Sequence, residues 1–334
     1  MVEGTQARWP TRAESQPHAC LVAPPPQTGL LAGAFDCVVH SLKDVPTTLP
    51  DGLALVAISD REDPRDCVLL PADASSAEHA DGLAALRALA PGSCVGTSSL
   101  RREALLAARC DGLVTHAVRG NLNTRYAKLC GEHDSCAQPG APQYKALLLA
   151  AAGVQRLGWQ ERVAGYLPGD EWPWGVGQGS LGVEVKCTLR GAVVGALIKR
   201  AVGDSAGTAA CVAERAFLKE LQGGCQVPLG TYTTQADASE RAVHVAVKGV
   251  VLSGDGATEL SATVEADIPK MTNSQALPSL YSGLSFTHMW CSEADAELVA
   301  QAEALGKALA QPLLAKGAAA LIHGESRGIT YGKA

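Results

Sequence analysis

Residues 93–118 read SCVGTSSLRREALLAARCDGLVTHAV, and this stretch decides the fold class. A short apolar run at 93–96 precedes a helical pattern at 100–109, and a second apolar run follows at 113–118. Short apolar runs that alternate with amphipathic helices are typical of strands in an α/β sheet with helices on both faces. The segment therefore predicts a strand, a helix and a strand of a mostly parallel sheet.

The alternation extends to both sides of this segment. Further strands are predicted at 35–39, 53–58, 67–70 and 146–149, and further helices at 82–89 and 151–157. From about residue 208 the pattern becomes a helix at 213–221, a hairpin of strands at 242–252 and 258–266, a long helix at 293–316 and a short strand at 318–322. The C-terminal part is therefore predicted to be a separate α+β domain.

Composition narrows the class of protein. The chain has 334 residues, 47% hydrophobic and 19% charged, with a formal net charge of −6. These are values of an ordinary globular protein, and the acidic balance argues against nonspecific binding to nucleic acid or membrane surfaces. Eleven cysteines without a regular spacing indicate reduced intracellular thiols. No apolar stretch reaches the length of a transmembrane helix.

Two arginine-bearing blocks, at 97–102 and 119–125, stand out against this acidic background. Both begin where a predicted strand ends, and ligands of α/β sheets bind beyond the carboxyl ends of strands. The hydroxyl residues before Arg101 have two interpretations, as plain helix caps or as part of an anion site at a helix N-terminus. Arginine binds carboxylates and phosphates through two parallel hydrogen bonds, so the blocks together predict a pocket for a polyanion.

Two further segments carry reactive side chains. Lys43 and Asp44 follow a predicted buried strand; they are either a neutralised surface pair or a cleft pair in which the carboxylate is catalytic. His40, beside them, is interpreted as a structural histidine. Cys225 lies in a glycine-flanked loop after a helix, and it is either a small buried apolar residue or an accessible nucleophilic thiol. The spacing of Cys130, His133 and Cys136 does not fit the common zinc patterns, so no metal is expected.

In order along the chain, these segments closely resemble hydroxymethylbilane synthases, also called porphobilinogen deaminases. The resemblance is carried by VVHSLKDVPTTLP at 38–50, REDPRD at 61–66, VGTSSLRREALL at 95–106, VRGNLNTRYAKL at 118–129, LLLAAAGVQRLGW at 147–159, GVGQGSLGVEVK at 175–186 and ERAFLKELQGGCQVPLGTY at 214–232. It implies two type II periplasmic-binding-protein-like domains around a cleft and a C-terminal α+β domain. The implied boundaries are 1–64 with 170–203, 65–169, and 204–334.

The resemblance also implies an activity, a cofactor and partners. The reaction is the condensation of four porphobilinogens, with release of ammonia, to linear hydroxymethylbilane. A covalent dipyrromethane cofactor is implied on Cys225. The substrate is a small molecule, and the protein is expected to be a cytoplasmic monomer, with a plastid as the alternative compartment.

Roles for individual residues follow from the same resemblance. Loss of ammonia from an aminomethylpyrrole leaves a cation, so Asp44 is expected to stabilise it and to move protons. Each pyrrole carries an acetate and a propionate, which need cationic and hydrogen-bonding partners. The expected binding residues are Ser41, Lys43, Thr97, Ser99, Arg101, Arg102, Arg119, Asn121, Arg125, Arg162 and Gln178.

Residues 1–30 depart from the family pattern, because they lack its first strand motif and the glycine-lysine-phenylalanine lid loop. The first domain is therefore expected to lack its first strand, its first helix and the lid. The alternative function is that of a weak or inactive homologue that only binds polypyrrole carboxylates.

Overall fold

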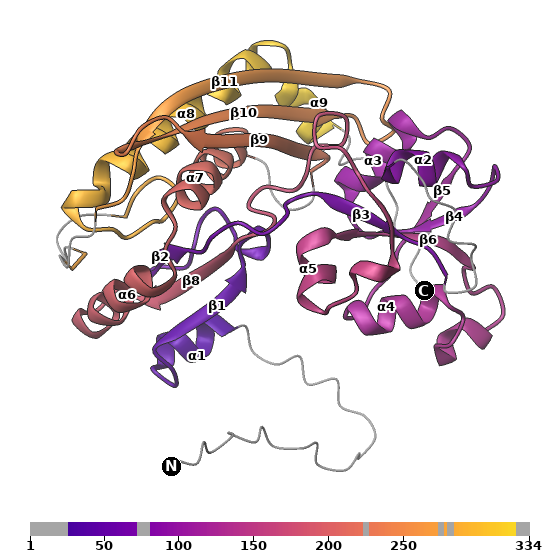
Figure 1. Ribbon diagram of the computed structural model, residues 1–334, viewed down its shortest axis with the longest axis horizontal. Helices are drawn as coiled ribbons and strands as arrows, with labels where there is room; N and C mark the ends of the chain where they lie inside the picture. Colours follow the sequence, from indigo (N-terminus) through magenta and orange to yellow (C-terminus); the bar gives the residue numbers. More distant parts are fainter. Residues whose placement is uncertain (1–25, 72–80, 223–226, 273–276, 279–283, 325–334) are drawn as a thin grey trace.

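The computed structural model describes residues 26–71, 81–222, 227–272, 277–278 and 284–324. Within these residues the strands form three separate sheets, and helices cover them (Figure 1). The chain crosses between the first and second sheets twice, through residues 59–65 and again through 167–180. None of the helices in the described part of the chain is both long and apolar enough to span a bilayer.

The first sheet is a small antiparallel one. Its order is β1 (Cys37–Ser41), β8 (Leu181–Lys186), β2 (Leu53–Ile58), and β8 runs antiparallel to both neighbours. Two helices pack on it, α1 (Pro26–Ala32) and α6 (Leu189–Val202). Every residue of β2 is buried, as expected for a strand covered on both faces.

The second sheet has the order β5-β4-β6-β3-β7. Its strands are β3 (Asp66–Leu69), β4 (Cys94–Gly96), β5 (Val114–His116), β6 (Tyr144–Ala150) and β7 (Val163–Tyr166). Its helices are α2 (Gly82–Arg87), α3 (Leu100–Arg109), α4 (Leu122–Leu129) and α5 (Ala151–Arg156). β4 is parallel to β5 and β6, whereas β3 is antiparallel to β6 and β7.

The third sheet is an antiparallel meander in the order β11-β10-β9. It consists of β9 (Leu229–Asp237), β10 (Ala242–Leu252) and β11 (Glu259–Pro269). Three helices accompany it, α7 (Ser205–Glu220), α8 (Ala296–Ala315) and α9 (Ala318–Gly324). In Figure 1 this sheet arches over the first one, with α7 between them.

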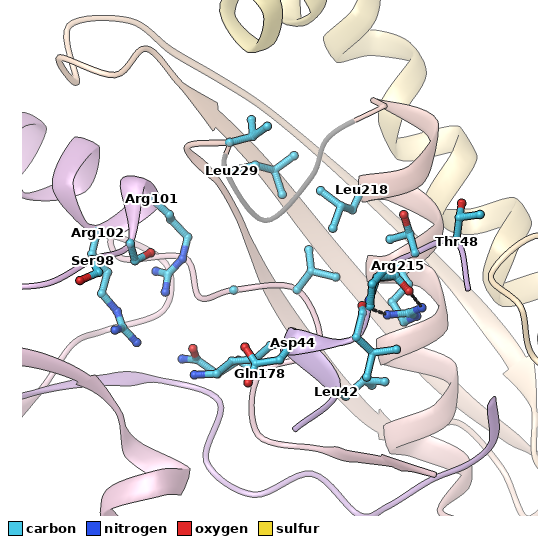
Figure 2. A pocket seen from close by; sticks show the side chains of 18 residues that line it. Leu42, Asp44, Thr48, Ser98, Arg101, Arg102, Gln178, Arg215, Leu218 and Leu229 are labelled. Carbon is cyan, nitrogen blue, oxygen red and sulfur yellow. Dashed lines mark hydrogen bonds between the residues drawn. The ribbon is translucent and has the colours of Figure 1, made fainter. Parts of the chain in front are cut away.

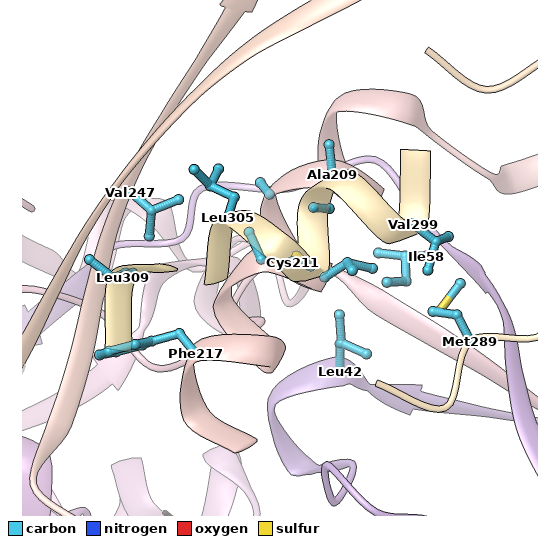
Figure 3. Packing of buried hydrophobic residues seen from close by; sticks show 14 of the residues in the cluster. Leu42, Ile58, Ala209, Cys211, Phe217, Val247, Met289, Val299, Leu305 and Leu309 are labelled. Atoms are coloured by element: carbon cyan, nitrogen blue, oxygen red, sulfur yellow. The ribbon is translucent and has the colours of Figure 1, made fainter. Parts of the chain in front are cut away.

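The largest apolar cluster joins the first and third sheets into one packed body. Ile58 of β2 and Leu42, in the turn after β1, belong to this cluster together with Ala209 of α7, and all three are at most 1% exposed (Figure 3). The second sheet has its own apolar clusters. One of these clusters also contains Val250 and Leu252 of β10, so the second sheet packs against the third as well.

Helices α7 and α8 approach each other closely at Gly306. A Cβ at this position would lie 2.1 Å from the carbonyl oxygen of Ala213, a distance that no side chain tolerates. We expect Gly306→Ala to lower the free energy of unfolding by about 1–3 kcal/mol, the usual cost of overpacking a core. The measurement is the urea midpoint followed by circular dichroism. Gly153→Ala is the matched control, because its Cβ would come no closer than 3.3 Å to Leu122 Cδ1. Equal midpoints for the two variants would contradict this account.

Three features of the fold differ from the sequence-based predictions. The segment 318–322, predicted as a strand, belongs to helix α9, because alanine favours helix and a short apolar run does not distinguish the two states. The sheets are not mostly parallel. β3 and β8 are each reached directly from the other sheet rather than through a crossover helix, so nothing forces them to run parallel to their neighbours. Strands β7, β8 and β9 and helices α1, α4 and α6 were not predicted.

Candidate active site

A cavity of about 510 Å3 lies where the three parts of the fold meet. A second cavity of about 390 Å3 continues it toward α4 and α5. The two share the residues Lys43, Asp44, Ser98, Ser99, Arg102 and Gln178. Figure 2 shows Arg101 and Arg102 reaching from α3 toward Asp44 and Gln178. Most of the binding residues predicted from the sequence are thus brought into one continuous cleft.

The loop that carries Asp44 is held in place from α7. Leu42–Asp44 forms a single 3₁₀ turn directly after β1, and Leu42 is buried beneath it. Arg215 of α7 donates from Nη1 to the carbonyl oxygen of Val45 at 2.9 Å and from Nη2 to that of Pro46 at 2.7 Å. These charge-assisted bonds fix the backbone just after Asp44. The carboxylate is therefore presented from a rigid turn.

Lys43 stands in a strongly cationic environment. The pKa of its ammonium group is lowered to about 8, chiefly by burial and in addition by Arg102 and Arg101, against the opposing effect of Asp44 and Asp66. A lysine whose pKa lies this close to neutral has lost much of its hydration without gaining a full counter-ion. An anionic ligand in the cleft would supply the missing negative charge.

Helix α3 presents its first turn to the cleft. Ser99 is the N-cap residue, yet its side chain makes no capping hydrogen bond, and it lines both cavities. Of the two interpretations of these hydroxyls, this geometry favours the anion site, because the Ser99 hydroxyl is not used by the helix. Arg101 and Arg102 follow in the first turn and are only 5% and 6% exposed.

Both guanidinium groups are anchored behind the cleft on Asp66. Arg101 Nη1 donates to Asp66 Oδ2 at 2.9 Å, and Arg102 Nη2 donates to Asp66 Oδ1 at 2.7 Å. Arg102 Nε is buried and has no hydrogen-bond partner among the described residues. An unpaired buried N–H of a cation carries a large desolvation cost, so this donor is suited to a ligand oxygen.

The second arginine block contributes Arg125 and Asn121 to the smaller cavity. Asn121 caps α4 by accepting a hydrogen bond from Thr124 N at 2.8 Å, which starts the helix that carries Arg125. Burial lowers the pKa of Arg125 and nearby Arg102 lowers it further, whereas Asp44 raises it. Arg125 therefore faces the smaller cavity together with Arg102 and Asp44.

Three predicted residues do not line either cavity. Thr97 is buried and accepts a hydrogen bond from Ser99 N, so it shapes the loop from behind. Arg119 is exposed. Arg162 stacks over Tyr126 and Trp159, with its guanidinium carbon 4.6 and 4.4 Å from the two ring centres. Of the remaining predictions, Ser41 lines the smaller cavity, and Cys225 lies outside the described residues.

The sequence-based reasoning missed four residues that build the site. Arg215 and Asp66 hold the two sides of the cleft, and Arg156 lines the smaller cavity. Glu214, fully buried, binds Arg61 at 2.8 and 3.0 Å and accepts from Gly177 N at 2.8 Å. It thereby ties both crossover segments to α7. All four are charged residues within the segments that carry the family resemblance, and this was the signal in the sequence that could have identified them.

The fold and the site define a protein with a cationic cleft between two sheets and with a third sheet alongside. Residues 27–190 match the family model described as "Porphobilinogen deaminase, dipyromethane cofactor binding domain". Residues 208–279 match "Porphobilinogen deaminase, C-terminal domain". The chain belongs to the porphobilinogen deaminase family.

Named relatives agree with this assignment. The chain is 44% identical over 239 residues to a porphobilinogen deaminase of Chromobacterium violaceum, 45% over 198 residues to one of Yarrowia lipolytica, and 41% over 230 residues to one of Synechococcus elongatus. These alignments cover 71%, 59% and 69% of this chain. They span 68%, 53% and 64% of the relatives' own lengths, so for the second and third less than two thirds.

The residues present fit a dipyrromethane cofactor, the group named for the family's first domain. Such a cofactor carries four carboxylates on two apolar rings. The lining of the larger cavity contains the cationic side chains of Arg101, Arg102 and Lys43, and the buried Arg102 Nε donates to no described residue. The same lining contains the apolar side chains of Leu218, Val227 and Leu229.

Proposed function

We propose that this chain is a hydroxymethylbilane synthase, which joins four porphobilinogens with release of four molecules of ammonia and then frees the linear hydroxymethylbilane by hydrolysis with one water. The observation that carries the proposal is the placement of Asp44 on a fixed turn, inside one continuous cleft with Lys43, Arg102 and Arg125. A carboxylate among cations suits a ligand that has carboxylate side arms and develops a positive charge at its ring. The carboxylate side arms of the ligand require the cations, and the positive charge that develops at its ring requires the carboxylate of Asp44.

The geometry supports distinct roles for these residues. When bound, the cofactor supplies an electron-rich pyrrole carbon to which the first substrate is joined. Asp44 stabilises the cation left when the substrate amine departs as ammonia, and it takes up the proton released when the new carbon–carbon bond forms. Arg101, Arg102 and Arg125 bind the acetate and propionate groups, and Lys43 adds a further positive charge. Cys225 forms the thioether to the cofactor.

The domain organisation is part of the same proposal. Residues 1–64 with 170–203 form the first domain, 65–169 the second and 204–334 the third, the first two being of the type II periplasmic-binding-protein kind. Support comes from the three separate sheets and from the two crossover segments that join the first two. The chain acts as a cytoplasmic monomer in this proposal.

The test uses the freshly purified full chain. Intact-mass spectrometry should show the added mass of a dipyrromethane, peptide mapping should place it on Cys225, and Ehrlich's reagent should give a colour. Incubation with porphobilinogen should then release ammonia and yield a product that cyclises to uroporphyrinogen, which an added oxidant converts to uroporphyrin for detection. Protein that carries the adduct but does not consume porphobilinogen would reduce the proposal to a binding function. Protein without adduct and without turnover would refute it.

A further inference from the structure

Asp66 accepts four hydrogen bonds from four different side chains, although it is fully buried. Oδ2 accepts from Arg101 Nη1 at 2.9 Å and from Trp172 Nε1 at 3.0 Å. Oδ1 accepts from Arg102 Nη2 at 2.7 Å and from Gln178 Nε2 at 2.8 Å. All four partners are donors, so only an ionised carboxylate satisfies the set. An asparagine would turn its own N–H₂ group toward two of them.

Asp66 also stands at a junction of the fold. It is the first residue of β3, where the chain enters the second sheet from the first. Gln178 lies on the returning crossover and donates to the carbonyl oxygen of Pro64 as well, at 2.7 Å. Arg101 and Arg102 belong to α3. One carboxylate thus links the cleft arginines to both chain segments that join the two sheets.

The hydrogen bonds to Asp66 decide which edge of each guanidinium faces the cleft. Arg101 Nη1 is used by Asp66 and by the carbonyl oxygen of Pro173 at 2.7 Å, and Arg102 Nη1 donates to that of Leu148 at 2.9 Å. A guanidinium is planar and has five N–H donors in a rigid fork, so fixing one edge aims the other. Arg102 Nε is buried, and no described residue accepts a hydrogen bond from it.

The charge of Asp66 matters as much as its shape. Burial alone would raise the pKa of its carboxyl group, but Arg101 and Arg102 reverse this effect and hold the pKa far below its ordinary value. The carboxylate therefore stays ionised under all working conditions. It leaves the two arginines with one net positive charge and also counteracts the depression of the pKa of Lys43. The net charge of the cleft is positive, and Asp66 reduces the repulsion between its cationic side chains.

We infer that Asp66 is a positioning residue of the active site: its four hydrogen bonds aim the free donors of Arg101 and Arg102 at the ligand carboxylates. Asp66 does not touch the ligand in this arrangement, since its oxygens are taken up by protein donors. The expected effect of Asp66 on kcat rests on the proposed function. Its electrostatic consequence, the support of the charge on Lys43, does not depend on turnover.

The first test is Asp66→Asn with Asp63→Asn as the matched control. Asp63 lies in the same short segment, but its carboxylate pairs with half-exposed Arg65 at 2.7 Å, outside both cavities. We expect Asp66→Asn to lower kcat roughly 100-fold, the scale of a misplacement by about 1 Å. KM should stay within about threefold or fall, because the cleft gains one positive charge. Asp63→Asn should match the wild type. A residue that only supports folding would lower the yield of folded protein and leave kcat per folded molecule unchanged.

A second variant keeps the positioning role testable if Asp66→Asn does not fold, and a second measurement tests the electrostatic role in the folded proteins. Asp66→Glu keeps the charge but displaces the carboxylate, so kcat should still fall about tenfold. The titration of Lys43 is read without turnover, from the pH dependence of its acetylation by acetic anhydride in peptide mass spectra. The midpoint should lie near 8 in the wild type and in Asp66→Glu, and lower by about half a unit or more in Asp66→Asn. Asp44, Arg101 and Arg102 are unchanged in all three proteins.

The outcomes separate the two proposals. A wild type that does not consume porphobilinogen refutes the proposed function, and the acetylation midpoints still decide the electrostatic part of this inference. A wild type that turns over, together with Asp66→Glu and folded Asp66→Asn variants of unchanged kcat, refutes the positioning role. An unchanged Lys43 midpoint in Asp66→Asn refutes the electrostatic role.

Discussion

Asp44→Asn should slow porphobilinogen condensation by about 100-fold or more, while the cofactor adduct still forms. Asparagine has nearly the same shape, so the 3₁₀ turn and the bonds from Arg215 to the following carbonyls should persist. What is lost is the negative charge beside the reacting ring and the group that accepts the proton. Removing one such electrostatic or acid–base group typically costs two to four powers of ten in rate, or roughly 100-fold at least. Single-turnover assays with porphobilinogen measure the rate, and intact mass measures the adduct.

Asp51→Asn is the control for this prediction. Asp51 is an exposed carboxylate a few residues further along the same segment and lines neither cavity. It should leave the rate unchanged, which shows that the effect of Asp44 does not come from the overall charge. A condensation rate for Asp44→Asn within about twofold of the wild type would correspond to a change of less than 1 kcal/mol in activation free energy. Such a result would remove Asp44 from the mechanism.

The elements that the sequence predicts well are those whose pattern is local. Helix 100–109 and strand 242–252 have the predicted bounds, because each has a clear period and a turn or cap at its ends. Strand β8 was missed although the segment 175–186 had been singled out, because its glycines weaken the strand pattern. The pairing of β8 between β1 and β2 depends on contacts across more than a hundred residues, which no local pattern encodes.

In the site, too, the sequence predicts the residues whose position follows from a local pattern and misses those that depend on distant contacts. The strand-end rule correctly predicts that Arg101, Arg102 and Arg125 reach one cleft with Lys43 and Asp44. It does not distinguish Arg125 from Arg119, because the difference depends on the capped helix that lifts only Arg125 into the cavity. Nor does it predict Asp66, whose partners come from α3 and from the distant crossover segment 167–180. Asp66 ends the charged run 60–66, whose residues up to 65 join the first sheet to the second, so this run both connects the sheets and supports the site.

The crossover segments are also where the fold and the site meet. Glu214 and Arg215 are neighbours on α7, and one holds the crossovers while the other holds the loop of Asp44. A shift of α7 would therefore move both sides of the cleft together. This coupling explains why buried charged residues, which are costly to bury, concentrate at this end of the helix.

Lys43 should give the activity an alkaline limit near pH 8. Its ammonium group binds ligand carboxylates only when protonated, and its pKa lies at about 8 instead of the ordinary 10.5. As the pH rises above 8, kcat/KM should fall by up to roughly tenfold per unit, reaching about 100-fold at pH 10 if this charge is essential. The titration of Lys43 does not lower kcat/KM by unfolding the protein. Between pH 8 and 10.5 the unfolded chain binds more protons at Lys43 than the folded one, so its contribution to stability rises with pH.

Lys43→Arg tests this interpretation, because a guanidinium stays charged throughout the range. The variant should lose the alkaline limb between pH 7.5 and 9.5, even if its kcat/KM at pH 7 is several-fold lower from the altered geometry. Lys145→Arg, at an exposed position on β6, is the matched control and should keep the limb of the wild type. All three proteins meet the same substrate, so ionisation of the porphobilinogen amine affects them equally and cancels in the comparison. A limb of the same midpoint in Lys43→Arg and in the wild type would assign the titration to another group and leave Lys43 without an electrostatic role in binding.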